Sequence, residues 1–158
     1  MRESIFASEI MRSLRELNVW CYKIPDNPTS WTMARTRFTA EKPCDIIASV
    51  NGRAVLLELK QIKKWQAFGK TQIRGSQFLH LTEAVKAGAK SFVLLNVRIK
   101  PEGVFKRENR LIVFDWEQWG SYFLEHTVKA KDLVNHEFIQ GTKGRFNLTT
   151  FLDRIHGL

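Results

Sequence analysis

The sequence predicts a single α/β domain in which a central mixed β-sheet is flanked by helices. Segments with apolar residues at helical spacing alternate with short runs of apolar and β-branched residues, which is typical of this class. The 158 residues are 44% hydrophobic and include only nine Gly and four Pro, which allows one substantial core and argues against disorder. No repeat or low-complexity segment interrupts the chain, so we expect one domain over residues 1–158.

The first elements follow from hydrophobic periodicity. Residues 3–17 carry apolar side chains at helical spacing, as in an amphipathic helix that packs on a sheet, and residues 19–24 have the composition of a strand. Residues 25–42 contain prolines, hydroxyl side chains and basic residues, so they predict a long basic loop, and long loops in compact domains are often functional. Two strands of a hairpin should follow, at about 43–50 and 53–61.

The later elements are less regular. Lys63 to Ser76 is polar and basic, and the helix after it should end at Gly88. A short C-terminal helix could be capped by Asn147 or Thr149. The expected elements of this half are two strands and three helices, at 91–97, 111–114, 77–87, 116–124 and 149–155.

The hairpin sets two carboxylates against each other. Asn51-Gly52 between apolar runs is a strong hairpin signal, because both central residues of a type I′ turn take positive φ. A two-residue turn places Asp45 directly opposite Glu58, and Lys60 shares their face because side chains alternate with period two. Like charges directly opposite destabilise a sheet by about 0.2–1 kcal/mol, and a divalent cation between them reverses that sign. A surface hairpin with a cross-strand Glu-Lys pair is the structural alternative.

This cluster has the chemistry of a magnesium site for phosphodiester hydrolysis. Mg²⁺ prefers oxygen ligands, and Asp45, Glu58 and the backbone carbonyl of Leu59 can supply three; Mn²⁺ should substitute. Lys60 can orient the attacking water or counter the phosphate charge. The cluster contains no His or Cys ligand spacing, which argues against zinc. Cys21 and Cys44 lie in apolar, strand-like sequence and are expected to be buried, reduced thiols.

The charge of the chain favours an anionic partner. Lys and Arg number 25 and Asp and Glu 16, which gives a formal net charge of +9. This profile is typical of nucleic-acid-binding proteins, although anionic lipid or an acidic protein would also be attracted. No apolar run is long enough to span a membrane and the N-terminus has no signal-peptide core, so the cytoplasm is the expected location and no membrane partner is expected.

The acidic hairpin resembles the PD-(D/E)xK nuclease superfamily. In that superfamily an acidic residue follows a proline on one strand, and an acidic-x-Lys triplet lies on the next strand. Residues 43–45 (Pro-Cys-Asp) match as Pro-x-Asp, and residues 58–60 (Glu-Leu-Lys) match the triplet. The resemblance implies a restriction-endonuclease-like core and a metal-dependent nuclease.

Residues 1–98 are similar more narrowly to the Holliday-junction resolvases of bacterial, archaeal and phage type. That resemblance implies a glutamate on the first helix, which we assign to Glu3 with Glu9 as the alternative, and a glutamine on a later helix, which we assign to Gln77. Either Glu3 or Gln77 could instead be an ordinary polar residue of a helix terminus. A phage-encoded member would work in the cytoplasm of its host. Residues 99–158 show no specific match and form a C-terminal elaboration.

The candidate DNA-binding residues belong to two groups. The long loop mixes basic and aromatic side chains that could stack on bases, pin the loop to the core or enter a dimer interface: Trp31, Arg35, Arg37 and Phe38, with Lys42 at its end. Basic residues that follow the triplet suit phosphate contact, although they could form a solvated face: Lys63, Lys64, Lys70 and Arg74.

The sequence therefore predicts a Mg²⁺-dependent, structure-selective endodeoxyribonuclease that resolves four-way junctions. Because such a junction is two-fold symmetric and needs paired incisions, a homodimer matches it. Another endonuclease of the superfamily, of restriction or repair type, is the nearest alternative. A non-catalytic DNA-binding module of the same fold and an RNA-processing nuclease are the others.

Overall fold

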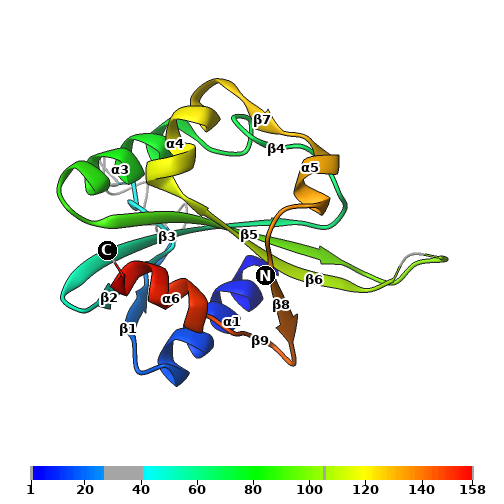
Figure 1. Ribbon diagram of the computed structural model, residues 1–158, viewed down its shortest axis with the longest axis horizontal. Coiled ribbons are helices and arrows are strands. Elements are labelled where there is room, and N and C mark those ends of the chain that lie inside the picture. The colour runs from blue at the N-terminus through cyan, green and yellow to red at the C-terminus, as the bar shows by residue number, and fades with distance from the viewer. Residues whose placement is uncertain (1, 27–40, 105, 158) are drawn as a thin grey trace, which may run out of the picture.

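A seven-stranded mixed sheet with helices on both faces forms the centre of the molecule (Figure 1). The computed structural model describes residues 2–26, 41–104 and 106–157, and for residues 2–4 it describes the backbone alone. In sheet order the strands are β1 (Trp20–Lys23), β2 (Ile46–Val50), β3 (Arg53–Ile62), β5 (Lys90–Ile99), β6 (Glu108–Asp115), β8 (Ile139–Thr142) and β9 (Arg145–Phe146).

The remaining elements lie on the two faces of this sheet. The helices are α1 (Arg2–Glu16), α3 (Gly75–Lys86), α4 (Trp116–Glu125), α5 (Ala130–Val134) and α6 (Thr149–His156). β4 (Phe68–Gly69) and β7 (Thr127–Val128) pair as a small second sheet. In the described part of the chain, no helix is both long enough and apolar enough to cross a bilayer.

The strand pairing explains why the sheet is mixed. β3 and β5 are parallel and are joined through α3, whereas each of the other neighbouring pairs in the sheet is antiparallel. A parallel pair requires a crossover connection, and strands covered on both faces read as continuous apolar runs. The first eight residues of β5 are buried, as that position requires. The predicted α/β class with a central mixed sheet is confirmed.

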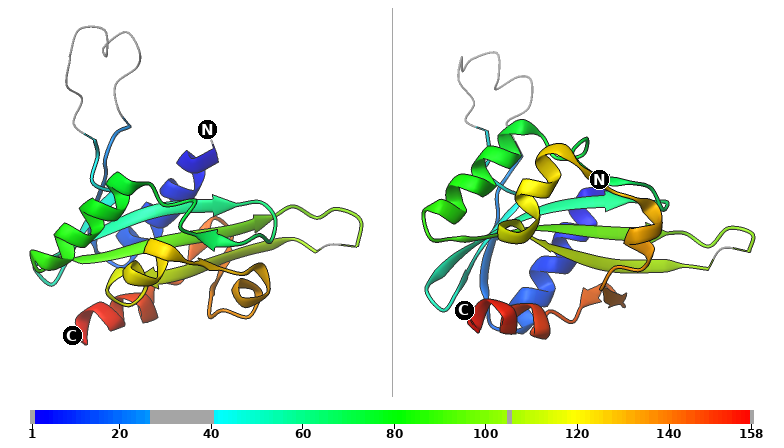
Figure 2. Two further views of the ribbon diagram at one scale, coloured as in Figure 1. Left: turned by 90° about the horizontal axis from the view of Figure 1, so that it is seen from above. Right: turned by 45° about the horizontal axis from the view of Figure 1, so that its top comes forward.

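Two hydrophobic cores lie on opposite faces of the sheet (Figures 1 and 2). The first is formed where α1 and α6 pack on the sheet, and it includes Phe6, Ile10 and Phe151. The second lies under α3 and α4, and it includes Leu81 and Phe123. The sheet is therefore held by apolar contacts on both sides, which fixes the strands that carry the candidate site.

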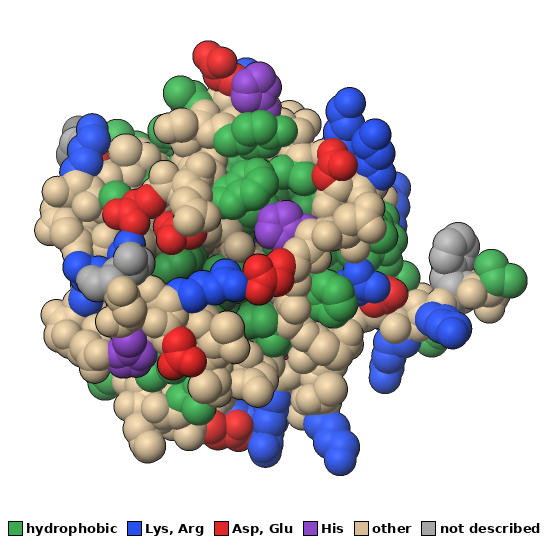
Figure 3. Space-filling view, viewed as in Figure 1, with side chains coloured by type: hydrophobic (Ala, Val, Ile, Leu, Met, Phe, Trp, Pro, Cys, Tyr) green, Lys and Arg blue, Asp and Glu red, His purple; other side chains and the backbone are tan. Residues whose placement is uncertain are grey.

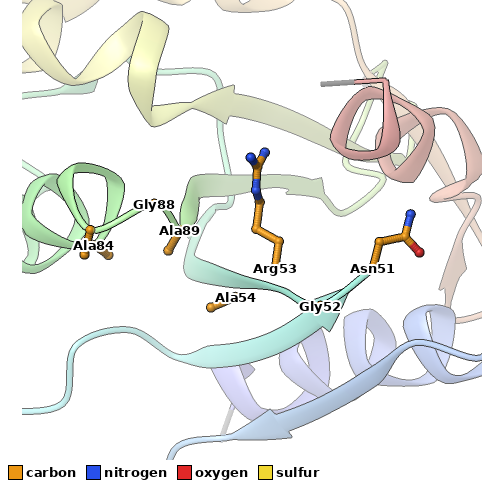
Figure 4. Close-up of a pocket in the computed structure, with 8 residues that line it drawn as sticks. Asn51, Gly52, Arg53, Ala54, Ala84, Gly88 and Ala89 are labelled. Carbon is orange, nitrogen blue, oxygen red and sulfur yellow. The ribbon is translucent and has the colours of Figure 1, made fainter.

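The β2–β3 hairpin has the predicted turn and register. Asn51 and Gly52 have φ angles of 50° and 75°, as a type I′ turn requires, and Val50 pairs with Arg53. A hollow lined mainly by Ala and Gly lies between this turn and the C-terminal end of α3 (Figure 4). Because Glu58 lies five residues beyond Arg53 along β3, the hollow is separate from the acidic cluster.

Most of the expected elements are present with small shifts at their ends. α3 begins at Gly75, two residues earlier than expected, because the side chain of Gln77 accepts a hydrogen bond from the backbone N–H of Arg74 and caps the helix. α6 begins at Thr149, and Asn147 Oδ1 accepts the N–H of Thr149. The prediction missed five short elements: β4, β7, α5, β8 and β9.

The C-terminal third completes the sheet. β6, β8 and β9 extend it beyond β5, and α6 packs on the first core. Residues 27–40 of the predicted basic loop lie outside the described part, and their flanks at Pro25 and Lys42 have no helix or strand. Cys21 and Cys44 are both buried and free, as expected.

The packing of β3 predicts the effect of a core substitution. Leu57 is fully buried in the first core, so Leu57→Ala should lower the free energy of unfolding by about 2–5 kcal/mol. Urea denaturation would measure this difference. Leu79→Ala is the matched control, because Leu79 is 53% exposed, and it should change stability by less than about 0.5 kcal/mol. Equal effects at the two positions would contradict the assigned core.

Candidate functional site

The candidate site lies where β2 begins and β3 continues past it. The β2–β3 ladder starts at the pair Ile46–Leu57, so β3 extends five residues beyond its β2 partner. Asp45 donates its backbone N–H to the Leu57 carbonyl over 3.1 Å, so it bonds to the partner of Ile46 and lies one residue out of the β2–β3 register. Its side-chain Oδ2 accepts the N–H of Leu59 over 2.7 Å. The Asp45 carboxylate therefore lies against the free edge of β3.

Glu58 is a buried carboxylate on the α3 face of the sheet. Its side chain is only 3% exposed, and its Oε1 accepts a hydrogen bond from Gln77 Nε2 over 2.5 Å. Lys60 Nζ lies 3.4 Å from the same oxygen. An ionised carboxylate at such a position requires partners, and these two side chains provide them.

Gln77 links the acidic strand to the start of α3. Its Oε1 accepts Lys60 Nζ and the N–H of Arg74, both over 3.0 Å, while its Nε2 donates to Glu58. One amide thus orients the acid and the lysine of the triplet and caps the helix. The structure therefore brings together Asp45, Glu58, Lys60 and Gln77, as the sequence predicted; their catalytic roles stay predictions.

Electrostatics show that the two acids interact. The pKa of Glu58 is raised to about 7, first by burial and then by the nearby Asp45 carboxylate, and Lys60 partly opposes this shift. The ladder between β2 and β3 ends at the pair Ile46–Leu57, so direct pairing of Asp45 with Glu58 stays a prediction.

The ammonium group of Lys42 lies beside the Asp45 carboxylate. Its Nζ lies 2.7 Å from Asp45 Oδ1 and 2.6 Å from Asp26 Oδ1. Burial opposes the charged form, but hydrogen bonds to Asp26 and Asp45 outweigh it and raise the pKa of Lys42. From the sequence, Lys42 is predicted to contact DNA. Its ion pair with Asp26 could not be predicted, because residues 16 apart on the two flanks of a loop give no local pairing signal. DNA contact by Lys42 stays a prediction.

The described donor set fits a hard cation such as Mg²⁺. The N–H and C=O of one strand residue point to the same edge, so the Leu59 carbonyl faces the edge where Asp45 accepts the Leu59 N–H. Burial raises the pKa of the Cys44 thiol to about 12, and its Sγ donates a hydrogen bond to the Ile46 carbonyl over 3.2 Å. Within the described residues, no three His, Cys, Asp or Glu side chains lie close enough to hold a metal. The oxygens here are two carboxylates and one carbonyl.

The two candidates for the acidic residue on α1 are Glu3 and Glu9. Glu3 lies in α1, but its side chain is outside the described part of the chain. The side chain of Glu9 forms an ion pair with Arg98, which follows Val97 on β5, and Val97 pairs with Ile62 at the far end of β3. Glu9 is therefore directed away from Asp45, and Glu3 stays the predicted helix-one acid.

The predicted phosphate-binding residues lie on the surface. Lys63 and Lys64 directly follow β3, Lys70 follows β4 and Arg74 is the N-cap of α3, and all four are exposed. The loop residues that were expected to contact DNA lie outside the described residues: Trp31, Arg35, Arg37 and Phe38.

Comparisons with known proteins add little. No family model matches the chain, and no curated protein matches it. Among solved structures, it is similar to a Holliday junction resolvase from the archaeal hyperthermophile Archaeoglobus fulgidus, with a TM-score of 0.42 and 13% identity over 82% of this chain and 98% of that chain. A likeness of this strength carries no argument about function, so membership of the PD-(D/E)xK superfamily stays a prediction.

The raised pKa of Glu58 predicts a pH-dependent stability. The folded state binds this proton more tightly than the unfolded state, so the stabilisation is present below about pH 4.5 and is lost as the pH rises through about 7. The loss should be about 3 kcal/mol, from a pKa near 4.5 unfolded and about 7 folded. Denaturation at pH 5 to 8 would measure it. Glu58→Gln should flatten this dependence, and an unchanged profile in that variant would contradict the assignment.

Proposed function

We propose that the protein is a metal-dependent endodeoxyribonuclease that hydrolyses phosphodiester bonds in branched DNA, with the four-way junction as its preferred substrate. The observation that carries the proposal is the Asp45 carboxylate bonded to the free edge of β3 at Leu59, next to the buried acid Glu58, to which Lys60 and Gln77 are bonded. Two close carboxylates and an ammonium group on one sheet face suit phosphoryl chemistry better than they suit scaffolding.

The residues of the site have separable roles in this proposal. Asp45, Glu58 and the Leu59 carbonyl would hold Mg²⁺ or Mn²⁺, which when bound supplies an activated water and neutralises charge on the phosphate. The Lys60 ammonium donates hydrogen bonds toward the attacking water or a non-bridging phosphate oxygen. Gln77 positions Lys60 and Glu58 by bonding to both, so it is a positioning residue.

The charge distribution supports DNA as the substrate. The formal charge of +9 attracts a polyanion, and four exposed basic residues lie on the tract between the end of β3 and the start of α3: Lys63, Lys64, Lys70 and Arg74. A C2 homodimer would present two such sites to a two-fold symmetric junction.

Relative cleavage of a four-way junction, a linear duplex and a flap would distinguish junction resolution from another DNA endonuclease. Matched RNA substrates would test an RNA-processing role.

Substitutions in the acidic cluster test the proposal. Asp45→Asn and Glu58→Gln should abolish Mg²⁺-dependent cleavage of a labelled four-way junction, because each removes a metal ligand. Junction affinity should stay equal or increase, since repulsion of phosphate falls. Lys60→Ala should slow cleavage without unfolding the protein.

The matched control is Glu83→Gln, which neutralises an exposed acid on α3, and it should leave cleavage unchanged. If all three site variants lose binding and cleavage equally, the cluster is structural. If the wild-type protein binds the junction and Mg²⁺ never induces cleavage, the protein is a non-catalytic DNA-binding module.

The contact of Lys42 with Asp45 predicts competition between that ammonium and a metal ion. Lys42→Met should increase Mn²⁺ affinity about 5- to 10-fold in calorimetric titration, because the ion no longer displaces a partly buried ammonium. Lys86→Met, which removes an exposed charge from α3, controls for net charge and should have a smaller effect. Equal affinities for the two variants would show that Lys42 does not compete for this position.

A further inference from the structure

The β5–β6 hairpin continues beyond the sheet as an arm, which we define as the described residues 98–104 and 106–109. The ladder between β3 and β5 ends at the pair Ile62–Val97, and the ladder between β6 and β8 ends at Arg110–Gln140. Past these pairs, β5 and β6 pair only with each other in the described part of the chain. The arm stands clear of the helices in each view (Figures 1 and 2).

The fold holds the base of the arm but gains little from its outer part. Arg98 forms an ion pair with Glu9 on α1, and the Asn109 carbonyl accepts a hydrogen bond from Gln140 on β8, so the base is anchored. Further out, every described residue from 100 to 107 is exposed, and Val104 at the tip is 93% exposed. An isolated two-stranded hairpin is marginally stable, so its projecting end needs a reason other than core packing.

The exposed charge of the arm favours an anionic partner. Its outer part carries Lys100, Lys106 and Arg107 against the single acid Glu102. Within the described residues, none of these three cations forms an ion pair. Figure 3 shows Lys and Arg side chains on the arm where it leaves the body of the molecule. A second copy of this basic chain would bring like charges together, which disfavours it as the partner.

The reach of the arm matches the repeat of duplex DNA. Val93 pairs with Glu58, and Gly103 at the tip lies ten residues further along the chain. At about 3.3 Å per residue of extended chain, the tip can lie up to about 33 Å from the level of Glu58. One turn of B-DNA spans about 34–36 Å, and its major groove admits a two-stranded β-ribbon.

We propose that the β5–β6 arm enters a groove of the DNA about one helical turn from the phosphodiester bond that lies at Asp45 and Glu58. This interaction rests on the proposed function. Lys100, Lys106 and Arg107 contact the phosphates that border the groove, and Val104 lies among the groove edges. The β5–β6 arm thereby fixes the direction of one duplex branch of the junction relative to the cut strand.

Two variants and a control test the arm. In the first variant, Asn-Gly replaces residues 100–107 and joins Ile99 to Glu108 through the kind of turn that already joins β2 to β3. The second is Lys100→Gln with Lys106→Gln and Arg107→Gln. The control removes three exposed lysines elsewhere: Lys129→Gln, Lys131→Gln and Lys143→Gln. Each is examined with a four-way junction by hydroxyl-radical footprinting and by binding at several salt concentrations.

The wild-type protein and the control should both protect the backbone about ten base pairs from the cut, and both arm variants should lose that protection. The arm-charge variant should show a slope of log K against log salt that is smaller by about 2 to 3, since each phosphate contact contributes about 0.9. The control should also lower the slope if its lysines lie near DNA, but its distal footprint should be retained.

Retention of the distal footprint in both arm variants would overturn the proposal. So would a change from dimer to monomer on arm deletion without DNA, because the arm would then bind a second copy. Failure of the nuclease proposal looks different: the wild-type protein would bind the junction and show the distal footprint but never cut. Absence of DNA binding by the wild-type protein would overturn both proposals.

Discussion

The repulsion between Asp45 and Glu58 is the constraint around which this part of the molecule is built. Burial of Glu58 and the proximity of Asp45 both oppose ionisation of the buried acid. The surroundings offset this cost with a hydrogen bond from Leu59 N–H to Asp45 and with a bonded amide at Glu58. Lysine ammonium groups lie beside each acid. Because burial and a second acid destabilise the ionised form of Glu58, the free energy that holds this cluster in place must come from packing elsewhere.

That packing comes from the central parallel pair. β3 and β5 are covered on both faces, by the α1 and α6 core on one side and by the α3 and α4 core on the other. Glu58 lies between apolar neighbours on β3 and pairs with the buried Val93. Because strands buried on both faces move little, the acidic oxygens and the start of α3 keep a fixed relation. Gln77 can then bond to two strand residues and still cap its helix.

How much of this could be predicted depends on the range of each signal. The Asn51-Gly52 turn is local and fixes the register of β2 and β3, so the pairs from Val50–Arg53 to Ile46–Leu57 follow by counting. The pairing of Lys42 with Asp26, and that of Glu9 with Arg98, depends on how distant segments pack and has no local pattern. The short elements β4, β7, α5, β8 and β9 were missed for the same reason, because tertiary contacts rather than periodicity hold elements of two to five residues.

Unequal strand lengths connect the acidic cluster to the arm. β3 and β5 each have ten residues, whereas β2 has five and β8 has four. Where β2 is absent, β3 has a free edge, and the Asp45 side chain bonds to it instead of a neighbouring strand. Where β3 and β8 are absent, β5 and β6 project as a ribbon. At the free edge of β3 and in the β5–β6 arm, backbone that the sheet does not cover is followed by exposed basic residues. These two features lie toward the same end of the sheet, because the parallel strands β3 and β5 run in the same direction. An extended polyanion that lies along this end can contact both features at once, whereas a compact ligand can contact only one.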